Sequence, residues 1–345
     1  MRACVLKAFG SVDNLGIEEI VDPVPGVGQV VIDVDAAGIT HGEFLVIQGK
    51  YQTLPPLPFV PGKELAGVVT AVGKDVTVLR PGDRVLGIAE SGAYGERASV
   101  EEKDCYLLPD AIPFVHAAAM GIAYQTAYFA LMDSGRYREG ETVLINGASG
   151  GVGLAAVQLA KAKGATVLAG LTTPAKAALV KANGADHVVD LSQRNPEESL
   201  REQVYAVTGE RGADVIIDMI GADVFDASLR ALAWRGRMVT VGFLGGRVPL
   251  IKANYLLIKN ITVSGLFWMT YRNRLAQEVR DVYQELFRLY SAGKLKPVVM
   301  EVFALDDIHL AFARLSKRQM QGRVMLTPRS QEQRRDKTAV SRPQP

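Results

Sequence analysis

The sequence predicts an α/β protein that combines a β-rich part with a doubly wound parallel sheet. Three observations lead to this fold class. Short strands punctuated by turns fill the first 110 or so residues, strands and helices alternate from Thr142 onward, and a glycine-rich turn joins the first of these strands to its helix. Glycine is also abundant, with 34 in 345 residues against about 7% in an average protein.

The amino-terminal part reads as a barrel or sandwich of short strands. Residues 29–36 alternate apolar and polar side chains, residues 65–72 form a continuous apolar run, and residues 83–88 are a third candidate strand. No crossover helix interrupts them. Pro-Gly pairs mark turns at 25–26, 61–62 and 81–82.

From residue 142 the pattern becomes that of βαβ units. A strand over 142–146 precedes a helix that ends near Lys163, and a strand over 165–169 precedes a helix that begins at Pro174. Further strands are expected over 187–191, 213–219, 236–242 and 261–267. The last of these is apolar and β-branched and is expected at the sheet edge, where it favours pairing with a second copy of the chain. A loop or helix covering this edge is the alternative.

The carboxy-terminal part contains a helical stretch over 272–292 and a β-α-β pattern over 296–326. Residues 329–345 are polar and without periodicity, so we expect a disordered tail. An interaction tail is the alternative for this segment.

Composition excludes several classes of protein. Hydrophobic residues make up 48% of the chain, which rules out general disorder, and a net charge of +2 does not favour a nucleic-acid partner. The two cysteines cannot form a four-cysteine zinc site. No apolar run reaches the roughly 18 residues of a membrane span. The sequence therefore predicts a soluble, cytoplasmic protein.

The turn over 146–153, N-G-A-S-G-G-V-G, matches the dinucleotide fingerprint G-x-G-x-x-G with its first glycine relaxed to Ala148. Gly150 allows a pyrophosphate to approach the backbone, and Gly153 allows the helix to pack closely on the strand. The candidate phosphate-binding residues are Ser149, Gly150, Gly151, Val152 and Gly153.

The residues after the second βαβ strand favour NADPH over NADH. NAD sites usually carry an acidic residue about 20 positions beyond the glycines, but there is none between Glu141 and Asp186. Thr173 and Lys176 stand there instead, and a hydroxyl with an ammonium suits a 2′-phosphate. The alternative is that Lys176 is an ordinary solvated lysine.

Several segments together resemble the medium-chain dehydrogenase/reductase superfamily, in its zinc-free quinone oxidoreductase branch related to zeta-crystallin. They are AAGITHGEFLVIQGKY (36–51), PFVPGKELAGVV (58–69), PGDRV (81–85), AYQTAY (123–128), NGASGGVG (146–153), GRMVTVGF (236–243) and RQMQGRV (318–324). The resemblance implies a GroES-like catalytic domain over 1–121 and 268–328, a Rossmann NADPH-binding domain over 122–267, and a homodimer.

The resemblance also bears on metal chemistry. Thr40 and Lys63 stand where zinc-dependent members have cysteine and histidine ligands, and a hydroxyl and an ammonium are poor replacements. Glu64 remains, but one carboxylate does not make a site. We therefore expect no metal.

Site residues follow from the resemblance. It places Thr40 and Tyr51 at the substrate mouth, although the branch more often has asparagine at the position of Thr40. Tyr51 either donates a proton or packs against the cofactor. Further cofactor contacts implied are Thr126 at the carboxamide, Gly242, Phe243, Phe267 and Trp268 near the nicotinamide, and Arg318 at the ribose phosphate. Phe267 and Trp268 could instead be core or interface residues.

The expected function is hydride transfer from NADPH to quinones or α,β-unsaturated carbonyl compounds without zinc. One alternative is an enoyl-thioester reductase of the same fold. The other is a non-catalytic, crystallin-like protein that binds NADPH.

Overall fold

The computed structural model describes residues 1–193, 195–316 and 320–329, and these form two compact units. One unit contains Met1–Ile122 and the described residues from Pro297 onward, and the other contains Ala123–Lys296. The sequence placed residues 268–296 in the first domain, whereas their contacts group them with the second unit.

The first unit is built on a seven-stranded sheet with the strand order β14-β15-β3-β4-β5-β7, in which β6 pairs with β3. The three strands expected from the sequence are β3 (Gln29–Ile39), β4 (Glu64–Val72) and β5 (Arg84–Ile88). They pair antiparallel. The others are β6 (Arg97–Glu101), β7 (Cys105–Leu107), β14 (Val299–Ala304) and β15 (Arg323–Thr327).

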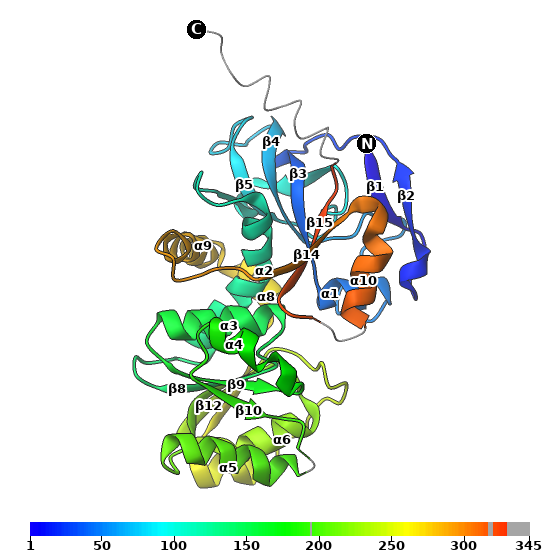
Figure 1. Cartoon of the computed structure of the whole chain (residues 1–345). Helices are drawn as coiled ribbons and strands as arrows, with labels where there is room; N and C mark the ends of the chain where they lie inside the picture. Colours follow the sequence, from blue (N-terminus) through cyan, green and yellow to red (C-terminus); the bar gives the residue numbers. More distant parts are fainter. Residues whose placement is uncertain (194, 317–319, 330–345) are drawn as a thin grey trace. The chain divides into compact units, whose positions relative to one another are not determined.

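Smaller elements complete this unit. A separate two-stranded sheet joins β1 (Arg2–Leu6) to β2 (Leu15–Glu19), and the unit holds the helices α1 (His41–Ile47) and α10 (Ile308–Ser316). The β-α-β pattern near the carboxy terminus is confirmed as β14, α10 and β15. It joins this unit because β15 pairs antiparallel with β3, from Val324 opposite Ile39 to Leu326 opposite Ala37. Figure 1 shows α10 in orange beside α1.

The helix α2 (Phe114–Phe129) carries the chain from one unit to the next. Its backbone is not helical at Gly121, directly before the boundary between the units. A Cβ at Gly121 would lie 2.5 Å from Oε2 of Glu64, so a larger residue at this point would have to displace the buried Glu64 side chain.

The second unit is a six-stranded parallel sheet with the order β10-β9-β8-β11-β12-β13. Numbered along the chain, this is the 3-2-1-4-5-6 order of a Rossmann sheet. The strands are β8 (Thr142–Asn146), β9 (Thr166–Leu171), β10 (His187–Asp190), β11 (Ala213–Asp218), β12 (Leu232–Thr240) and β13 (Thr262–Gly265). The predicted α/β fold class, including the sixth strand at the edge, is confirmed.

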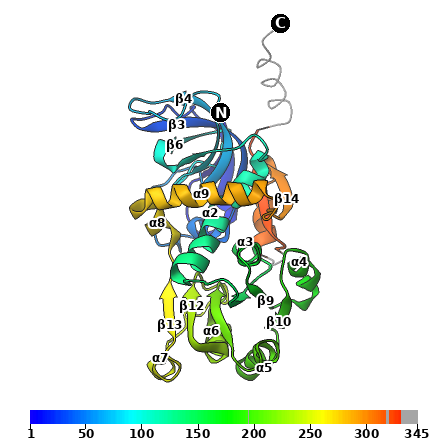
Figure 2. The same cartoon turned by 90° about the vertical axis from the view of Figure 1, so that its left-hand side faces the viewer.

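Helices cover both faces of this sheet, as the doubly wound pattern predicts. In Figure 1, α3 (Gly151–Ala162) and α4 (Ala177–Ala182) lie on one side of strands β8–β10, while α5 (Pro196–Thr208) and α6 (Ala222–Ala231) lie on the other. Figure 2 shows α7 (Ala253–Lys259) below the edge strand β13. The single helical stretch expected over 272–292 is instead two helices, α8 (Trp268–Arg274) and α9 (Ala276–Ser291), because Leu275 leaves the helical conformation.

Candidate functional site

The glycine-rich turn between β8 and α3 has the geometry of a phosphate cradle. Gly150 is the N-cap of α3 in an extended conformation, and no side chain caps this end of the helix. The first N–H groups of α3 are therefore available to an anion, and the helix dipole favours negative charge there.

The glycines of the turn have two separate roles. A Cβ at Gly150 would meet only the Gly147 carbonyl oxygen, at 3.6 Å, so the space above Gly150 is open for a ligand. A Cβ at Gly153 would overlap the Gly147 carbonyl oxygen and lie 2.7 Å from Cα of Ala148. Gly153 is thus required for the fold of the turn, whereas the turn itself leaves room for a side chain at Gly150.

The second strand ends beside this cradle. β8 and β9 run parallel, with Asn146 opposite Gly170, so both chains leave the sheet at the same edge. Thr173 is the N-cap of a short 3-10 helix, Pro174–Lys176, which precedes α4. Burial lowers the pKa of the Lys176 ammonium. Thr173 and Lys176 thus follow the neighbouring strand at the edge that carries the glycine turn, and they bring no carboxylate with them.

Four further predicted cofactor residues of this unit follow other strands at that edge. Gly242 and Phe243 come after β12, and Phe267 and Trp268 come after β13. Phe243 and Phe267 are 42% and 38% exposed, whereas Trp268 is 9% exposed and lies under the guanidinium of Arg272. Exposure suits the two phenylalanines for ligand contact, and burial gives Trp268 a packing role as well.

Thr126 on α2 carries a buried hydroxyl oxygen with no hydrogen-bond partner among the described residues. A buried polar atom without a partner costs free energy. A carboxamide group at this position would supply the missing hydrogen bond. The open cradle at Gly150 and the unpaired Thr126 oxygen both fit a nicotinamide dinucleotide.

A buried polar network at the carboxyl ends of β8 and β11 was not anticipated from the sequence. Asn146 donates through Nδ2 to Oδ1 of Asp218 (3.1 Å) and to Oγ of Ser228 (2.8 Å), and Asp218 accepts the N–H of Gly221. Burial raises the pKa of Asp218, against these hydrogen bonds. In the sequence, two apolar strands each end in a polar residue, Asn146 after β8 and Asp218 after β11, and this pattern could have indicated the network. The network fixes the turn at the point where the strand order reverses.

In the first unit the structure brings together Thr40 and Tyr51. Thr40 is the N-cap of α1, where its Oγ1 accepts the N–H of Glu43 at 3.0 Å. A Cβ built at Gly42 would lie 3.6 Å from Oγ1 of Thr40 and 4.0 Å from the hydroxyl of Tyr51. Two hydroxyl groups therefore border the space above Gly42.

Two buried charged residues lie next to this pair. Lys63 is 4% exposed, donates through Nζ to the Glu90 carbonyl oxygen at 2.9 Å, and lies 5.7 Å from the ring centroid of Tyr51. Glu43 is 1% exposed and accepts the Gly62 N–H at 3.1 Å. Burial raises the pKa of Glu43, opposed by the charge of Lys63 and the Gly62 hydrogen bond. The position of Lys63 matters in the sequence as that of a lost metal ligand, and nothing in the sequence singles out Glu43.

The donor set of the first unit does not fit zinc. No group of three or more His, Cys, Asp and Glu side chains within the described ranges could hold a metal ion. Glu64 is already engaged, because it pairs with Arg323 and accepts the Ile122 N–H at 2.7 Å. Zinc independence remains a prediction.

Two sequence predictions fall on other parts of the chain. Arg318, the expected ribose-phosphate residue, and residues 330–345 of the expected tail lie outside the described residues. Arg329, which begins that tail, forms an ion pair with Asp33 (3.4 Å). Among the described residues, none of the helices combines the length and the apolar character that a membrane span requires.

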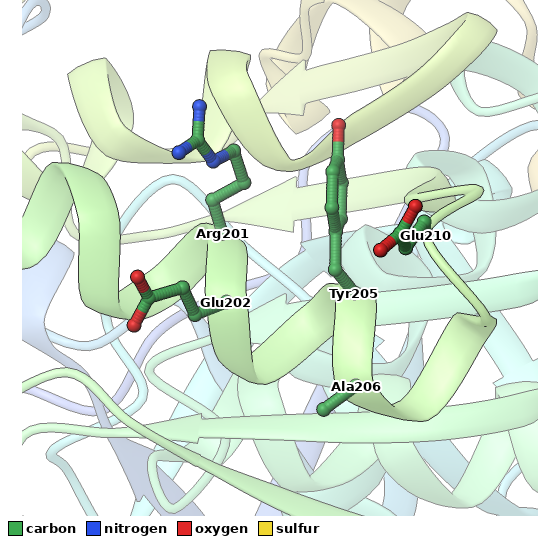
Figure 3. A pocket seen from close by; sticks show the side chains of 5 residues that line it. All are labelled: Arg201, Glu202, Tyr205, Ala206 and Glu210. Atoms are coloured by element: carbon green, nitrogen blue, oxygen red, sulfur yellow. The ribbon is translucent and has the colours of Figure 1, made fainter.

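Two surface pockets lie away from the predicted site residues. One is lined by Arg201, Glu202, Tyr205, Ala206 and Glu210, at the end of α5 that leads into β11. Figure 3 shows Arg201 and Tyr205 projecting to the same side of α5. This end of α5 precedes the amino end of β11, so the pocket lies at the opposite edge from the glycine turn. The other is lined by residues of the first unit, among them Asp35, Arg84 and Phe114.

Comparison with known proteins gives consistent matches. Residues 26–110 match the alcohol dehydrogenase GroES-like domain family, and residues 151–288 match the zinc-binding dehydrogenase family. The chain is 36% identical over 303 residues to a quinone oxidoreductase-like protein 2 homolog of Nematostella vectensis, covering 87% of this chain and 82% of the relative.

Solved structures agree with these matches. A quinone oxidoreductase of Pseudomonas syringae pv. Tomato superposes with a TM-score of 0.87 at 32% identity, covering 95% of this chain and 99% of that one. A mycobacterial protein solved in complex with NADPH superposes with a TM-score of 0.88 at 29% identity, covering 95% of this chain and 100% of that one.

Proposed function

The chain belongs to the medium-chain dehydrogenase/reductase superfamily, in its quinone oxidoreductase branch, and on that premise we propose that it is an NADPH-dependent reductase of quinones or α,β-unsaturated carbonyl compounds. It is an oxidoreductase with a nicotinamide cofactor. The finer assignment concerns which cofactor it prefers, which acceptor it reduces, and whether it needs a metal.

One observation carries the preference for NADPH. The chain segment after β9 presents Thr173 and Lys176 and no acidic side chain, next to the cradle that starts α3. A carboxylate there would accept the ribose hydroxyls of NADH and repel a 2′-phosphate. The mycobacterial neighbour solved with NADPH supports the same choice.

The chain's own residues have distinct roles in this proposal. The N–H groups at Gly150, Gly151 and Val152 bind the pyrophosphate, and Thr126 orients the carboxamide, so that one face of the nicotinamide is presented. The cofactor, when bound, supplies the hydride. Tyr51 and Thr40 contact the acceptor oxygen, and Tyr51 donates the proton that completes the reduction.

The class of acceptor follows from the absence of fitting metal ligands among the described side chains. An alcohol is oxidised easily only when an electrophile stabilises its alkoxide, and the hydroxyl of Thr40 and the ammonium of Lys63 are poor ligands for a metal that would do so. A quinone or an enone accepts hydride without this assistance because it is already electron-poor. Quinones, enones and enoyl thioesters therefore rank above simple alcohols as substrates.

A screen of NADPH oxidation against simple quinones, alkenals and enoyl thioesters tests the proposal. We expect turnover with quinones or alkenals and little with thioesters. Preferred turnover of enoyl thioesters would show that the protein is an enoyl-thioester reductase rather than a reductase of quinones or alkenals. Tight NADPH binding without turnover of any acceptor would instead make the chain a non-catalytic NADPH-binding protein.

A further inference from the structure

The buried charges beside Tyr51 have no role in the function proposed so far. Lys63 loses nearly all contact with water, since its side chain is 4% exposed, and a buried ammonium is costly unless it is well solvated by protein. Its Nζ donates to the Glu90 carbonyl oxygen, and the carboxylate of Glu90 is 3.9 Å away but 53% exposed. The structure thus holds a positive charge inside the first unit, over the ring of Tyr51.

A buried acidic side chain, that of Glu43 on α1, feels the charge of Lys63. One of its carboxyl oxygens accepts the Gly62 N–H. The second oxygen, Oε2, is buried with no hydrogen-bond partner among the described residues. Burial raises the pKa of Glu43, so the carboxyl group compensates the ammonium less than an exposed carboxylate would.

The ring that faces this charge is that of Tyr51. Nζ of Lys63 lies over the ring at 5.7 Å from its centroid, and the hydroxyl of Tyr51 lies near Thr40 and Gly42. A cation over an aromatic ring attracts the neutral ring weakly and a phenolate strongly, because the phenolate carries a full negative charge. Lys63 therefore favours the deprotonated form of Tyr51.

We propose that Lys63 is a positioning residue for proton transfer: its buried ammonium, which donates to the Glu90 carbonyl and lies over the ring of Tyr51, stabilises the phenolate that Tyr51 becomes when it gives its proton to the reduced acceptor. This rests on the proposed function for its kinetic consequence. The effect on Tyr51 itself does not depend on which acceptor is used.

When bound, the cofactor would supply one hydride, which carries both electrons, and the acceptor would then be an enolate or a hydroquinone monoanion. The O–H bond of Tyr51 breaks and a C–H bond forms at the α-carbon of the enone, or an O–H bond forms at the quinone oxygen. Solvent water then returns a proton to the phenolate.

The first test is a spectroscopic titration of Tyr51. The phenolate absorbance of the full-length protein is titrated with and without Tyr51→Phe, and the difference gives the midpoint for Tyr51. We expect Lys63→Met and Lys63→Gln to raise this midpoint by about one to two pH units. Gln retains a donor for the Glu90 carbonyl, so it removes the charge while keeping the hydrogen bond. Lys50→Met is the matched control, since Lys50 is exposed and its loss should leave the midpoint in place. An unchanged midpoint in both Lys63 variants overturns the proposal.

The second test is a double-mutant cycle in turnover. Lys63→Gln should lower kcat for an enone about 10- to 100-fold and leave the Kd for NADPH unchanged. In the Tyr51→Phe background, the same substitution should lower kcat no further. An equal loss in both backgrounds would show that Lys63 acts independently of Tyr51 and would overturn the proposal. If the wild-type protein reduces no acceptor, the proposed function fails, and the titration alone decides the role of Lys63.

Discussion

At the scale of single residues, Lys176 is the group on which cofactor choice depends most directly. A charge-assisted hydrogen bond to a phosphate contributes about 1.5–3 kcal/mol, which corresponds to about a 10- to 150-fold change in affinity. We expect Lys176→Ala to weaken NADPH binding by this factor and NADH binding much less. Measuring both dissociation constants by fluorescence checks the difference, and Lys181→Ala, on α4 one turn further along, is the control. Equal losses for NADPH and NADH would refute the assignment of Lys176.

Gly150 and Gly153 of the phosphate turn should respond differently to substitution. At Gly150 a side chain meets open space, so Gly150→Val should abolish cofactor binding while the melting temperature changes little. At Gly153 a side chain meets the backbone of Gly147 and Ala148, so Gly153→Val should destabilise the fold by several kcal/mol. Thermal unfolding and cofactor titration of both variants separate the two roles. A strongly unfolded Gly150→Val protein would contradict this account of the turn.

At the scale of elements, an ion-pair network ties α9 to the end of α3. Nζ of Lys163 donates to Glu285 at 2.8 Å, and Arg288 donates to the same carboxylate at 2.7 Å. The hydrogen bond from Arg288, with further contributions from Lys163, lowers the pKa of Glu285 to about 2. A depressed carboxyl pKa stabilises the folded state above the unfolded pKa, and this stabilisation is lost as the pH falls toward the folded pKa.

Glu285→Gln should therefore destabilise the protein near neutral pH and much less in acid. Allowing for partial solvent exposure, we expect a loss of about 1–2 kcal/mol in the free energy of unfolding at pH 7. The difference from the wild type should shrink as the pH falls from about 4.5 toward 2. Denaturant unfolding at several pH values measures it, and a difference that does not depend on pH would contradict the cited shift.

The elements show which features the sequence can predict. The β8, β9 and β11 strands were found because buried parallel strands are continuous apolar runs between glycines and prolines. The pairing of β15 with β3 was not predicted, because residues 323–327 and 29–39 are far apart in the chain and hydrophobic periodicity does not indicate which strands pair. The break at Leu275 between α8 and α9 was also missed, since apolar spacing continues through it.

The candidate site divides in the same way. The glycine turn was predicted because a contiguous motif binds phosphate mainly through its backbone. Thr173 and Lys176 were predicted because the segment after the second strand lacks the usual acidic residue. The sequence did not reveal the roles of three buried polar residues, Lys63, Glu43 and Asn146. These roles depend on burial and on neighbours distant in sequence. A charged side chain inside an apolar segment, as in P-G-K-E-L-A-G, is the signal that points to such residues.

At the scale of the whole molecule, the parallel sheet ends at β13 within the described chain. An edge strand of this kind invites pairing with another chain. The neighbouring helix α7 exposes Leu257 (79%) and Ile258 (72%), which adds apolar surface beside that edge. We expect a two-fold dimer joined through β13, with about twice the 37.2 kDa mass of one chain. Light scattering at working concentration measures the mass, and a monomer would contradict the dimer.

The central claim is that the protein reduces electron-poor acceptors with NADPH and without a metal. The most direct measurement is the rate of NADPH oxidation with a simple quinone and with an enone, before and after treatment with a strong chelator, alongside metal analysis of the same sample. We predict equal turnover before and after chelation, no stoichiometric zinc, and negligible oxidation of simple alcohols with NADP⁺. Loss of turnover on chelation that added zinc restores, or efficient oxidation of simple alcohols, would contradict it.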